Sequence, residues 1–144
     1  MEASDIFLEL TNKMKEKKTE EDETEGYRVL LLGVDDAGKT TFLYHYKLGV
    51  KVECIPTAGF NVETLDILGT KLVVWDIGGQ EKIRALWRHY YSNTRGIIYV
   101  VDSSNLEYFE TAKTELHKII ASEELKGVPL LVIASKQDKG GLSH

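Results

Sequence analysis

The sequence contains little that could cross-link the chain, bind a structural metal or span a membrane. Its 144 residues include one cysteine and four histidines, so no internal disulfide can form and no zinc site is indicated. Uninterrupted apolar runs are short, as in Ile97–Val101, whereas a transmembrane helix needs about 20 residues. The N-terminal region has no apolar segment followed by a small-residue cleavage site, so the sequence does not indicate a secretory signal peptide. A chain without disulfides is typical of the reducing cytosol, so we expect a cytoplasmic protein.

An excess of either charge is also missing from most of the chain. Residues 26–144 hold 14 acidic and 14 basic side chains, and residues 1–18 hold four of each. The net charge of −5 therefore comes from five acids within residues 19–25. A balanced domain lacks the basic surface that broad nucleic-acid binding requires, so we expect no nucleic-acid partner.

What is present divides the chain into three parts. Residues 1–18 are predicted to form an amphipathic helix, because apolar side chains recur at helical spacing from Ile6 to Met14. This helix could be a solvated leader, or it could dock reversibly on the domain or on a membrane surface. Residues 19–26 are predicted to be an extended acidic linker, since their carboxylates repel one another. Residues 27–144 carry the globular domain.

Apolar runs alternate with helical patterns in the globular domain. Four runs fit parallel strands that are covered on both faces: Val29–Leu32, Leu72–Trp75, Ile97–Val101 and Leu130–Ala134. Helices are predicted over Lys39–Leu48 and from near Ser103 or Ser104 to a point before Gly127 and Pro129. Phe60–Ile67 and Lys71–Asp76 are predicted to form an antiparallel hairpin. The predicted fold class is therefore α/β, a doubly wound, mostly parallel sheet with one antiparallel hairpin.

A phosphate-binding pattern follows the first predicted strand. Residues 33–40, Gly-Val-Asp-Asp-Ala-Gly-Lys-Thr, match G-x-x-x-x-G-K-[ST] between a strand and a helix. Backbone N–H groups of such a loop approach phosphate oxygens, the lysine adds a positive charge, and the threonine hydroxyl can bind Mg²⁺. The residues predicted to surround the nucleotide here are Asp35, Asp36, Ala37, Gly38, Lys39, Thr40 and Thr41. The pattern indicates a nucleoside triphosphate without saying which one.

Two further patterns follow predicted strands. Asp76 ends an apolar strand and could hold Mg²⁺ through water, together with Thr40. Gly79 could direct its N–H at a terminal phosphate, and Gln80 is predicted to be catalytic because it could orient an attacking water.

The last predicted strand is followed by Ser135-Lys136-Gln137-Asp138. The carboxylate of Asp138 could accept both the ring N–H and the amine of guanine, a donor pair that adenine lacks. The stem of Lys136 could cover the base. These residues therefore favour a guanine nucleotide.

Together these motifs resemble the Ras-like small GTPases, and most closely the ADP-ribosylation factor (Arf and Arf-like) family. Residues 55–64, 74–80 and 82–90 carry the resemblance along with the phosphate loop and Asp138, and it extends from about Tyr27 to Asp138. The double glycine before Gln80 and the Trp-Arg-His-Tyr run at 87–90 are its most specific features.

The resemblance implies a GTP-binding switch with GTP or GDP and Mg²⁺ as ligands. Thr57 would join Mg²⁺ and the terminal phosphate, and residues near 50–60 and 77–91 would be the two switch segments. The hairpin 60–76 would slide between nucleotide states, with the N-terminal helix as its plug. An exchange factor, a GTPase-activating protein and effectors would be partners in vesicle or membrane trafficking. Effectors would bind the aromatic residues Phe60, Trp75 and Tyr90.

Departures from the family pattern alter these expectations. Residue 2 is Glu, not Gly, so N-myristoylation is excluded and only weak peripheral association with endomembranes is expected. Ser135 stands where the family has Asn, and Asp36 adds a carboxylate to the phosphate loop. The sequence stops at His144, before the strand and helix with which the family fold continues. We therefore expect the face of the sheet at Val29–Leu32 to be incompletely covered.

Two other function classes fit parts of the pattern. A degenerate interaction module that binds nucleotide weakly and lacks GTPase activity fits Ser135, Asp36 and the early end of the sequence. A kinase with a phosphate loop fits residues 33–40, but Asp138 favours guanine and no lid-like basic segment is present.

Overall fold

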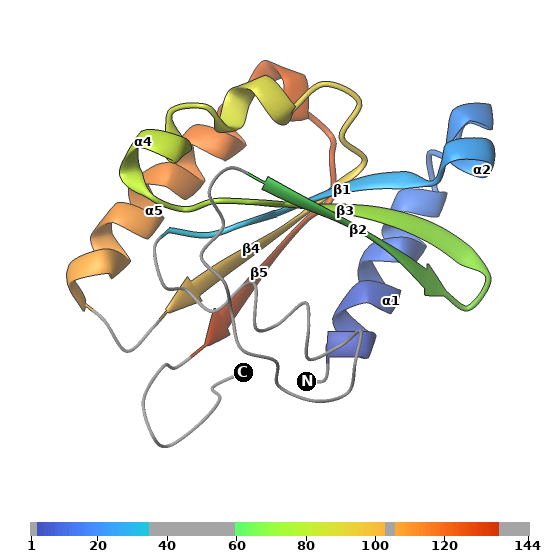
Figure 1. Cartoon of the computed structure of the whole chain (residues 1–144), viewed down its shortest axis with the longest axis horizontal. Coiled ribbons are helices and arrows are strands. Elements are labelled where there is room, and N and C mark those ends of the chain that lie inside the picture. Colours follow the sequence, from blue (N-terminus) through green and yellow to red (C-terminus); the bar gives the residue numbers. More distant parts are fainter. Residues whose placement is uncertain (1–2, 35–59, 103–105, 136–144) are drawn as a thin grey trace.

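Five strands form one mixed sheet in a computed structural model that describes residues 3–34, 60–102 and 106–135 (Figure 1). The strands lie in the spatial order β2-β3-β1-β4-β5. β1 pairs in parallel with β3 and β4, β4 pairs in parallel with β5, and β2 is antiparallel to β3. Their bounds are Tyr27–Leu32 for β1, Phe60–Ile67 for β2, Thr70–Ile77 for β3, Gly96–Asp102 for β4 and Leu130–Ser135 for β5. The predicted α/β class with one antiparallel hairpin is confirmed.

The hairpin between β2 and β3 turns at two residues with left-handed backbone. Leu68 has φ of 50° and Gly69 has φ of 87°, the signs that a tight primed turn requires. The Gly69 N–H donates to Asp66 Oδ1 at 2.7 Å, which holds the turn closed. The turn therefore fixes the register of the hairpin from Phe60 opposite Ile77 to Ile67 opposite Thr70.

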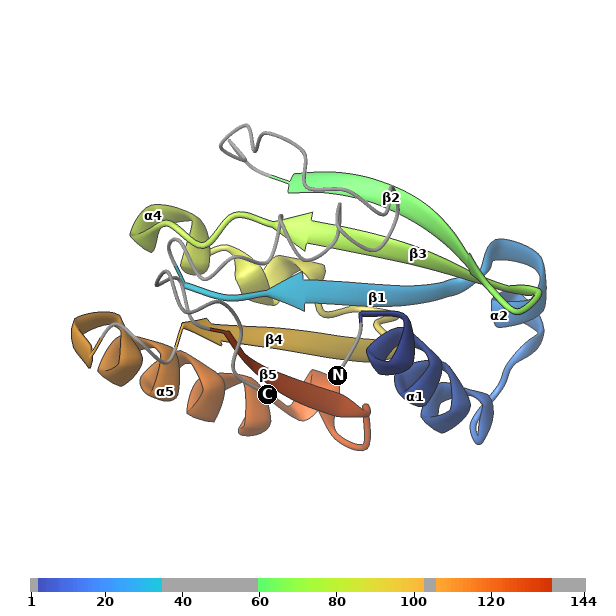
Figure 2. The same cartoon turned by 90° about the horizontal axis from the view of Figure 1, so that it is seen from below.

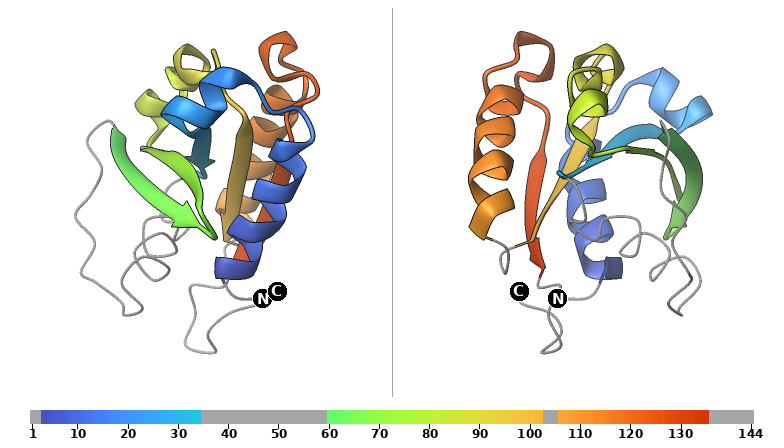
Figure 3. Two further views of the ribbon diagram at one scale, coloured as in Figure 1. Left: turned by 90° about the vertical axis from the view of Figure 1, so that its right-hand side faces the viewer. Right: turned by 60° about the vertical axis from the view of Figure 1, so that its left-hand side comes forward.

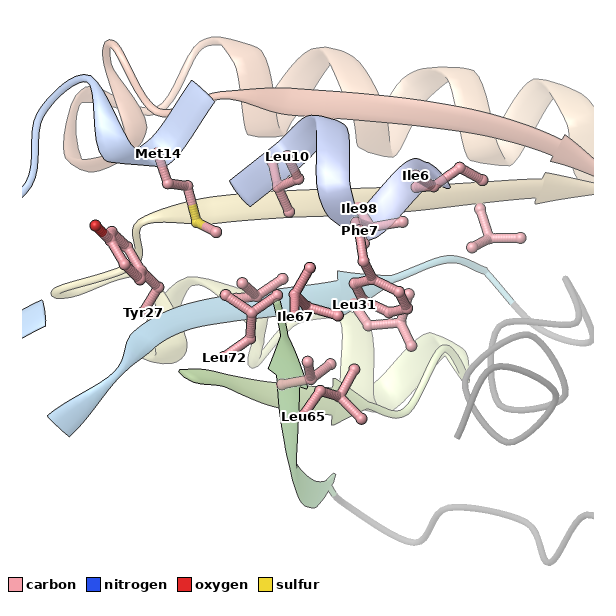
Figure 4. Packing of buried hydrophobic residues seen from close by; sticks show 13 residues of the cluster. Ile6, Phe7, Leu10, Met14, Tyr27, Leu31, Leu65, Ile67, Leu72 and Ile98 are labelled. Carbon is pink, nitrogen blue, oxygen red and sulfur yellow. The ribbon is translucent and has the colours of Figure 1, made fainter. Parts of the chain in front are cut away.

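One face of the sheet is covered by α1, Ala3–Lys15, whose apolar stripe points at the strands (Figures 3 and 4). Phe7 and Leu10 are fully buried, and Ile6 and Met14 are nearly so. Beneath them lie side chains of the central strands and of the hairpin: Tyr27, Val29, Leu31, Leu65, Ile67, Leu72, Val74, Ile98 and Val100. The expected exposure of this face is therefore wrong for Val29 and Leu31, because α1 provides the cover; Leu131 and Ile133 of β5 are only partly buried.

The acidic segment after α1 is not the extended linker that its charge predicts. Glu20–Glu25 forms a short helix, α2, that Thr19 begins with a capping box: the Thr19 side chain accepts from the Asp22 N–H, and the Asp22 carboxylate accepts from the Thr19 N–H. Asp22 is buried and pairs with Arg95 across 3.1 Å. Capping and this ion pair offset the repulsion among the neighbouring carboxylates.

Helical segments after β3 and β4 cover the opposite face (Figure 3). They are α4 (Glu81–Arg84), η1 (Trp87–Tyr90), α5 (Leu106–Ile120) and η2 (Glu123–Leu125). Their buried side chains include Trp87, whose ring meets the Tyr99 ring edge-on at 6.3 Å. The Tyr99 hydroxyl donates to the Ala112 carbonyl at 2.7 Å, so α5 is also tied to β4 by a buried hydrogen bond. The helix predicted at Lys39–Leu48 lies outside the described residues.

Candidate functional site

Two buried carboxylates lie where parallel strands end at one edge of the sheet. The carboxyl ends of β1, β3, β4 and β5 share this edge (Figure 2). Asp76 of β3 lies opposite Leu31 of β1 and is 1% exposed, and Asp102 ends β4 opposite Ser135 of β5. Ligands of open α/β sheets bind outside this edge. The structure thus brings Asp76, Gly79 and Gln80 to the edge where β1 ends and the phosphate-loop sequence begins.

The donors near Asp76 suit one kind of cation site. Across residues 3–34, 60–102 and 106–135, no three His, Cys, Asp or Glu side chains gather in a way that could hold a metal. A protein cage for a metal is therefore not found in this part of the chain. Mg²⁺ is commonly bound by one or two carboxylates, water and substrate phosphates, and the buried Asp76 fits that donor set.

The turn after β3 is held by side chains that follow it. Gly78 and Gly79 are buried, and their carbonyls accept hydrogen bonds from Trp87 Nε1 and Arg84 Nη1, each at 2.9 Å. Gln80 is the exposed residue that precedes α4, with extended backbone angles of −64° and 152°. Its carbonyl accepts from the N–H groups of Ile83 and Arg84 at 2.9 Å. The predicted catalytic residue therefore stands on a fixed backbone, four positions after Asp76.

Phe60, Trp75 and Tyr90 form an aromatic cluster beside this turn. The Phe60 ring stacks on the Trp75 ring at 5.1 Å, and the Tyr90 ring lies 5.6 Å from Phe60 and 6.1 Å from Trp75. Phe60 is 45% exposed, so the cluster reaches the surface. The structure thus brings together three predicted effector-binding residues from β2, β3 and η1. Trp75 and Tyr90 also pack against the α5-side core.

Arg28 completes this cluster, although sequence reasoning did not single it out. Its guanidinium carbon lies 4.1 Å above the Trp75 ring, and its Nη2 donates to the Tyr90 carbonyl at 3.2 Å. Burial lowers the pKa of Arg28. The only available signal was a charged residue inside an otherwise apolar strand. Arg84 and Glu115, which lie 3.8 Å apart between α4 and α5, were missed because they are 31 positions apart in the sequence.

The other predicted site residues lie at the end of β5 or beyond the residues that the structure describes. Ser135 is the last residue of β5. The remaining predicted nucleotide and metal ligands lie outside the described residues: Asp35, Asp36, Ala37, Gly38, Lys39, Thr40, Thr41, Thr57, Lys136 and Asp138. Among the helices that are described, none is long and apolar enough to cross a membrane.

Comparison with known proteins shows a family and a solved structure to which the chain is similar. A model of the ADP-ribosylation factor family matches residues 9–143. The solved structure of the Arl6 (BBS3) small GTPase from Trypanosoma brucei, with the bound nucleotide analogue GppNp, is 33% identical in sequence. That match has a TM-score of 0.69 and covers 81% of this chain and 71% of the other.

Proposed function

This chain belongs to the ADP-ribosylation factor family, and from that premise we propose that it is a switch protein that binds GTP and GDP with Mg²⁺ and hydrolyses GTP slowly. Members of this family are GTPases in general. The observation that carries the proposal is the buried Asp76 and the fixed Gly78–Gly79–Gln80 turn, one strand away from the phosphate-loop sequence that follows β1.

The residues at this edge would have separate roles in nucleotide binding and hydrolysis. The phosphate loop, with Lys39, would bind the phosphates. Thr40, Thr57 and Asp76, the last through water, would hold Mg²⁺, which would neutralise phosphate charge when bound. Gly79 would donate its N–H to the terminal phosphate, and Gln80 would orient the attacking water. No arginine is evident that could stabilise the transition state from within the chain, so a GTPase-activating protein would accelerate hydrolysis.

The base would be bound by residues that follow β5. Asp138 would accept from guanine, Lys136 would cover the ring, and Ser135 ends β5 at the same edge as Asp76. Serine is too short to bridge the base and the phosphate loop as asparagine could. The loss of one or two neutral hydrogen bonds would weaken affinity by about 2- to 100-fold.

Partner proteins would bind the β2–β3 hairpin and its aromatic cluster. Effectors would contact Phe60, Trp75 and Tyr90, whose rings lie together and reach the surface at Phe60. The β2–β3 hairpin also carries Leu65 and Ile67, which pack with α1. Sliding of the hairpin would therefore disturb the packing of α1 on the sheet. We place the protein in the cytoplasm, where a released α1 would bind endomembranes weakly during membrane trafficking.

A titration of fluorescent GTP and GDP in the presence of Mg²⁺, with ATP as competitor, tests the proposal. We expect both guanine nucleotides to bind and ATP not to displace them. Lys39→Ala should abolish binding because it removes the phosphate-loop charge, whereas Lys113→Ala, an exposed change on α5, should not. Gln80→Leu should keep GTP binding and slow single-turnover hydrolysis. If Lys39→Ala binds GTP as tightly as the parent, the phosphate role is wrong.

A degenerate interaction module that binds nucleotide weakly is the second candidate, and Ser135 and Asp36 favour it. Ser135→Asn restores an amide that could bridge base and loop. If the switch proposal holds, this variant should bind GDP more tightly than the parent. A parent protein and a Ser135→Asn variant that both fail to bind guanine nucleotide would favour the module.

A further inference from the structure

The two glycine carbonyls of the turn after β3 are both bound by side chains from the segment that follows. Trp87 Nε1 donates to the Gly78 carbonyl in a buried contact, and Arg84 Nη1 donates to the Gly79 carbonyl. Glycine itself imposes little conformational preference, so these bonds decide how the turn is oriented. Trp87 is 2% exposed and its ring packs against Tyr99, so its N–H is held in place by the core.

The planarity of the peptide bond passes this orientation on to the N–H groups. In a trans peptide the C=O of one residue and the N–H of the next point in opposite directions. The Gly78 carbonyl points at Trp87, so the Gly79 N–H points away from η1. The Gly79 carbonyl points at Arg84, so the Gln80 N–H points away from the Arg84 guanidinium. Both donors are therefore directed away from the helical side of the turn.

Arg84 is itself oriented by a residue of another element. Its Nε lies 3.8 Å from Glu115 Oε2 on α5, and the two side chains are only 12% and 16% exposed. A partly buried ion pair of this kind restricts the guanidinium more than a solvated one. Glu115 also has Lys118 at 3.5 Å, but that side chain is 68% exposed. The chain of contacts therefore leads from α5 through Glu115 and Arg84 to the Gly79 carbonyl.

We propose that Trp87 and Arg84 are positioning residues that aim the Gly79 and Gln80 N–H groups at the terminal phosphate of GTP, and that Glu115 orients Arg84 for this task. The proposal rests on the proposed function, in which Gly79 meets that phosphate and Gln80 orients water. It adds residues that touch neither nucleotide nor Mg²⁺. A purely structural role would tie α4 to α5 and would affect GDP and GTP equally, since GDP lacks the phosphate in question.

The affinity ratio between GDP and a non-hydrolysable GTP analogue separates these roles. Arg84→Met keeps the apolar stem and removes the donor, Glu115→Gln keeps the shape and removes the charge, and Trp87→Phe keeps a ring and removes the N–H. We expect each to leave GDP affinity within about twofold while GTP-analogue affinity falls about tenfold, the effect of one charged hydrogen bond. Single-turnover hydrolysis should fall by about tenfold or more, because positioned donors act on the transition state.

Matched variants provide the controls. Arg88→Met removes an exposed arginine of η1, and Lys118→Met removes the lysine that lies 3.5 Å from Glu115. Both variants should keep the parent's ratio of GTP-analogue affinity to GDP affinity. Arg84→Lys keeps a charged donor and should recover part of the lost GTP preference. In the Arg84→Met background, Glu115→Gln should not change the ratio of GTP-analogue affinity to GDP affinity any further, because the two residues are proposed to act as one unit.

The outcomes distinguish failure of this proposal from failure of the function. A parent that binds neither nucleotide overturns the proposed function and this proposal with it. A parent that binds both, with variants that keep its GTP-to-GDP ratio and hydrolysis rate, overturns the positioning role alone. Equal loss of affinity for both nucleotides also overturns it, because that result indicates a structural tie. If Trp87→Phe does not fold, Arg84→Met and Glu115→Gln decide the question.

Discussion

The two faces of the sheet are covered in different ways. On one face α1 lies on apolar side chains, with Phe7 and Leu10 at the centre of the contact (Figure 4). On the other face the helical cover also makes directional bonds, from Trp87 and Arg84 to backbone carbonyls and from Tyr99 to α5. Apolar contact is strong but non-directional, so it can be released and re-formed without one exact geometry. Directional bonds fix atoms in place, as the proposed contact with a terminal phosphate would require.

The β2–β3 hairpin contributes side chains to both faces of the sheet. Leu72 and Val74 belong to the α1 side, whereas Trp75 belongs to the α5 side and to the exposed aromatic cluster. A shift of this hairpin would therefore change the contacts of α1 and the exposed aromatic cluster together. In the proposed switch, α1 would be released from the apolar face. The turn on the hydrogen-bonded face would contact the terminal phosphate and so distinguish GTP from GDP.

The largest expected effect comes from removing the centre of the apolar face. Phe7→Ala should lower the free energy of unfolding by about 3–5 kcal/mol, the usual cost of truncating a fully buried phenylalanine. Urea denaturation measures it, and Asn12→Ala, on the exposed side of α1, is the control. A change below 1 kcal/mol for Phe7→Ala would mean that α1 does not cover the sheet as described.

A smaller effect should follow from pushing α1 away without removing any of its atoms. A Cβ at Gly96 would meet Met14 Sδ at 2.8 Å and Leu10 Cδ1 at 3.0 Å. Gly96→Ala should therefore cost about 1–3 kcal/mol of unfolding free energy through overpacking. If α1 causes the cost, a Met14→Ala background should reduce it, and a double-mutant cycle of urea denaturation measures that reduction. Strictly additive effects would place the strain elsewhere.

The hydrogen-bonded face should be sensitive to alkaline pH. Burial, followed by the charges of Glu115 and Glu124, raises the pKa of Tyr91 from 10 to about 12. The unfolded chain then loses this proton first, so the stabilisation is complete below pH 10 and is lost as pH rises toward 12. The fall approaches at most about 1.4 kcal/mol per pH unit for one such group.

Tyr91→Phe should make that fall shallower in urea denaturation between about pH 9 and pH 11.5, a range that starts below the unfolded pKa and approaches the folded pKa. It should not remove the fall, because burial also raises the pKa of Tyr99. Identical pH profiles for the parent and Tyr91→Phe would contradict the assignment of this titration to Tyr91.

The sequence predicts those parts of the fold that short-range patterns determine. Each apolar run that was assigned to a strand lies within one, and Leu68-Gly69 supplies the turn between β2 and β3. The stripe from Ile6 to Met14 indicates a buried face, but which surface buries it depends on strands far along the chain. For α2, charge counting gave the wrong answer, because the ion pair between Asp22 and Arg95 joins residues 73 positions apart.

The same limit applies to the site. Asp76 near the end of β3 and Gly79 and Gln80 just after it belong to one motif, so sequence alone predicts that they lie together. The hydrogen bonds of Trp87 and Arg84, and the ion pair of Arg84 with Glu115, are defined only by the packed fold. Resemblance singled out Phe60, Trp75 and Tyr90 as effector-binding residues, but neither the contacts among their rings nor the position of Arg28 above Trp75 was predicted.

Amide hydrogen exchange of the full chain, compared between GDP and a non-hydrolysable GTP analogue with Mg²⁺, tests the central claim most directly. The account predicts that residues 3–15 of α1 lose protection in the GTP-analogue state while residues 78–84 gain it, because one face is released as the other closes on the terminal phosphate. Equal protection of both segments in the two nucleotide states would contradict the account. A change of both segments in the same direction would contradict it as well.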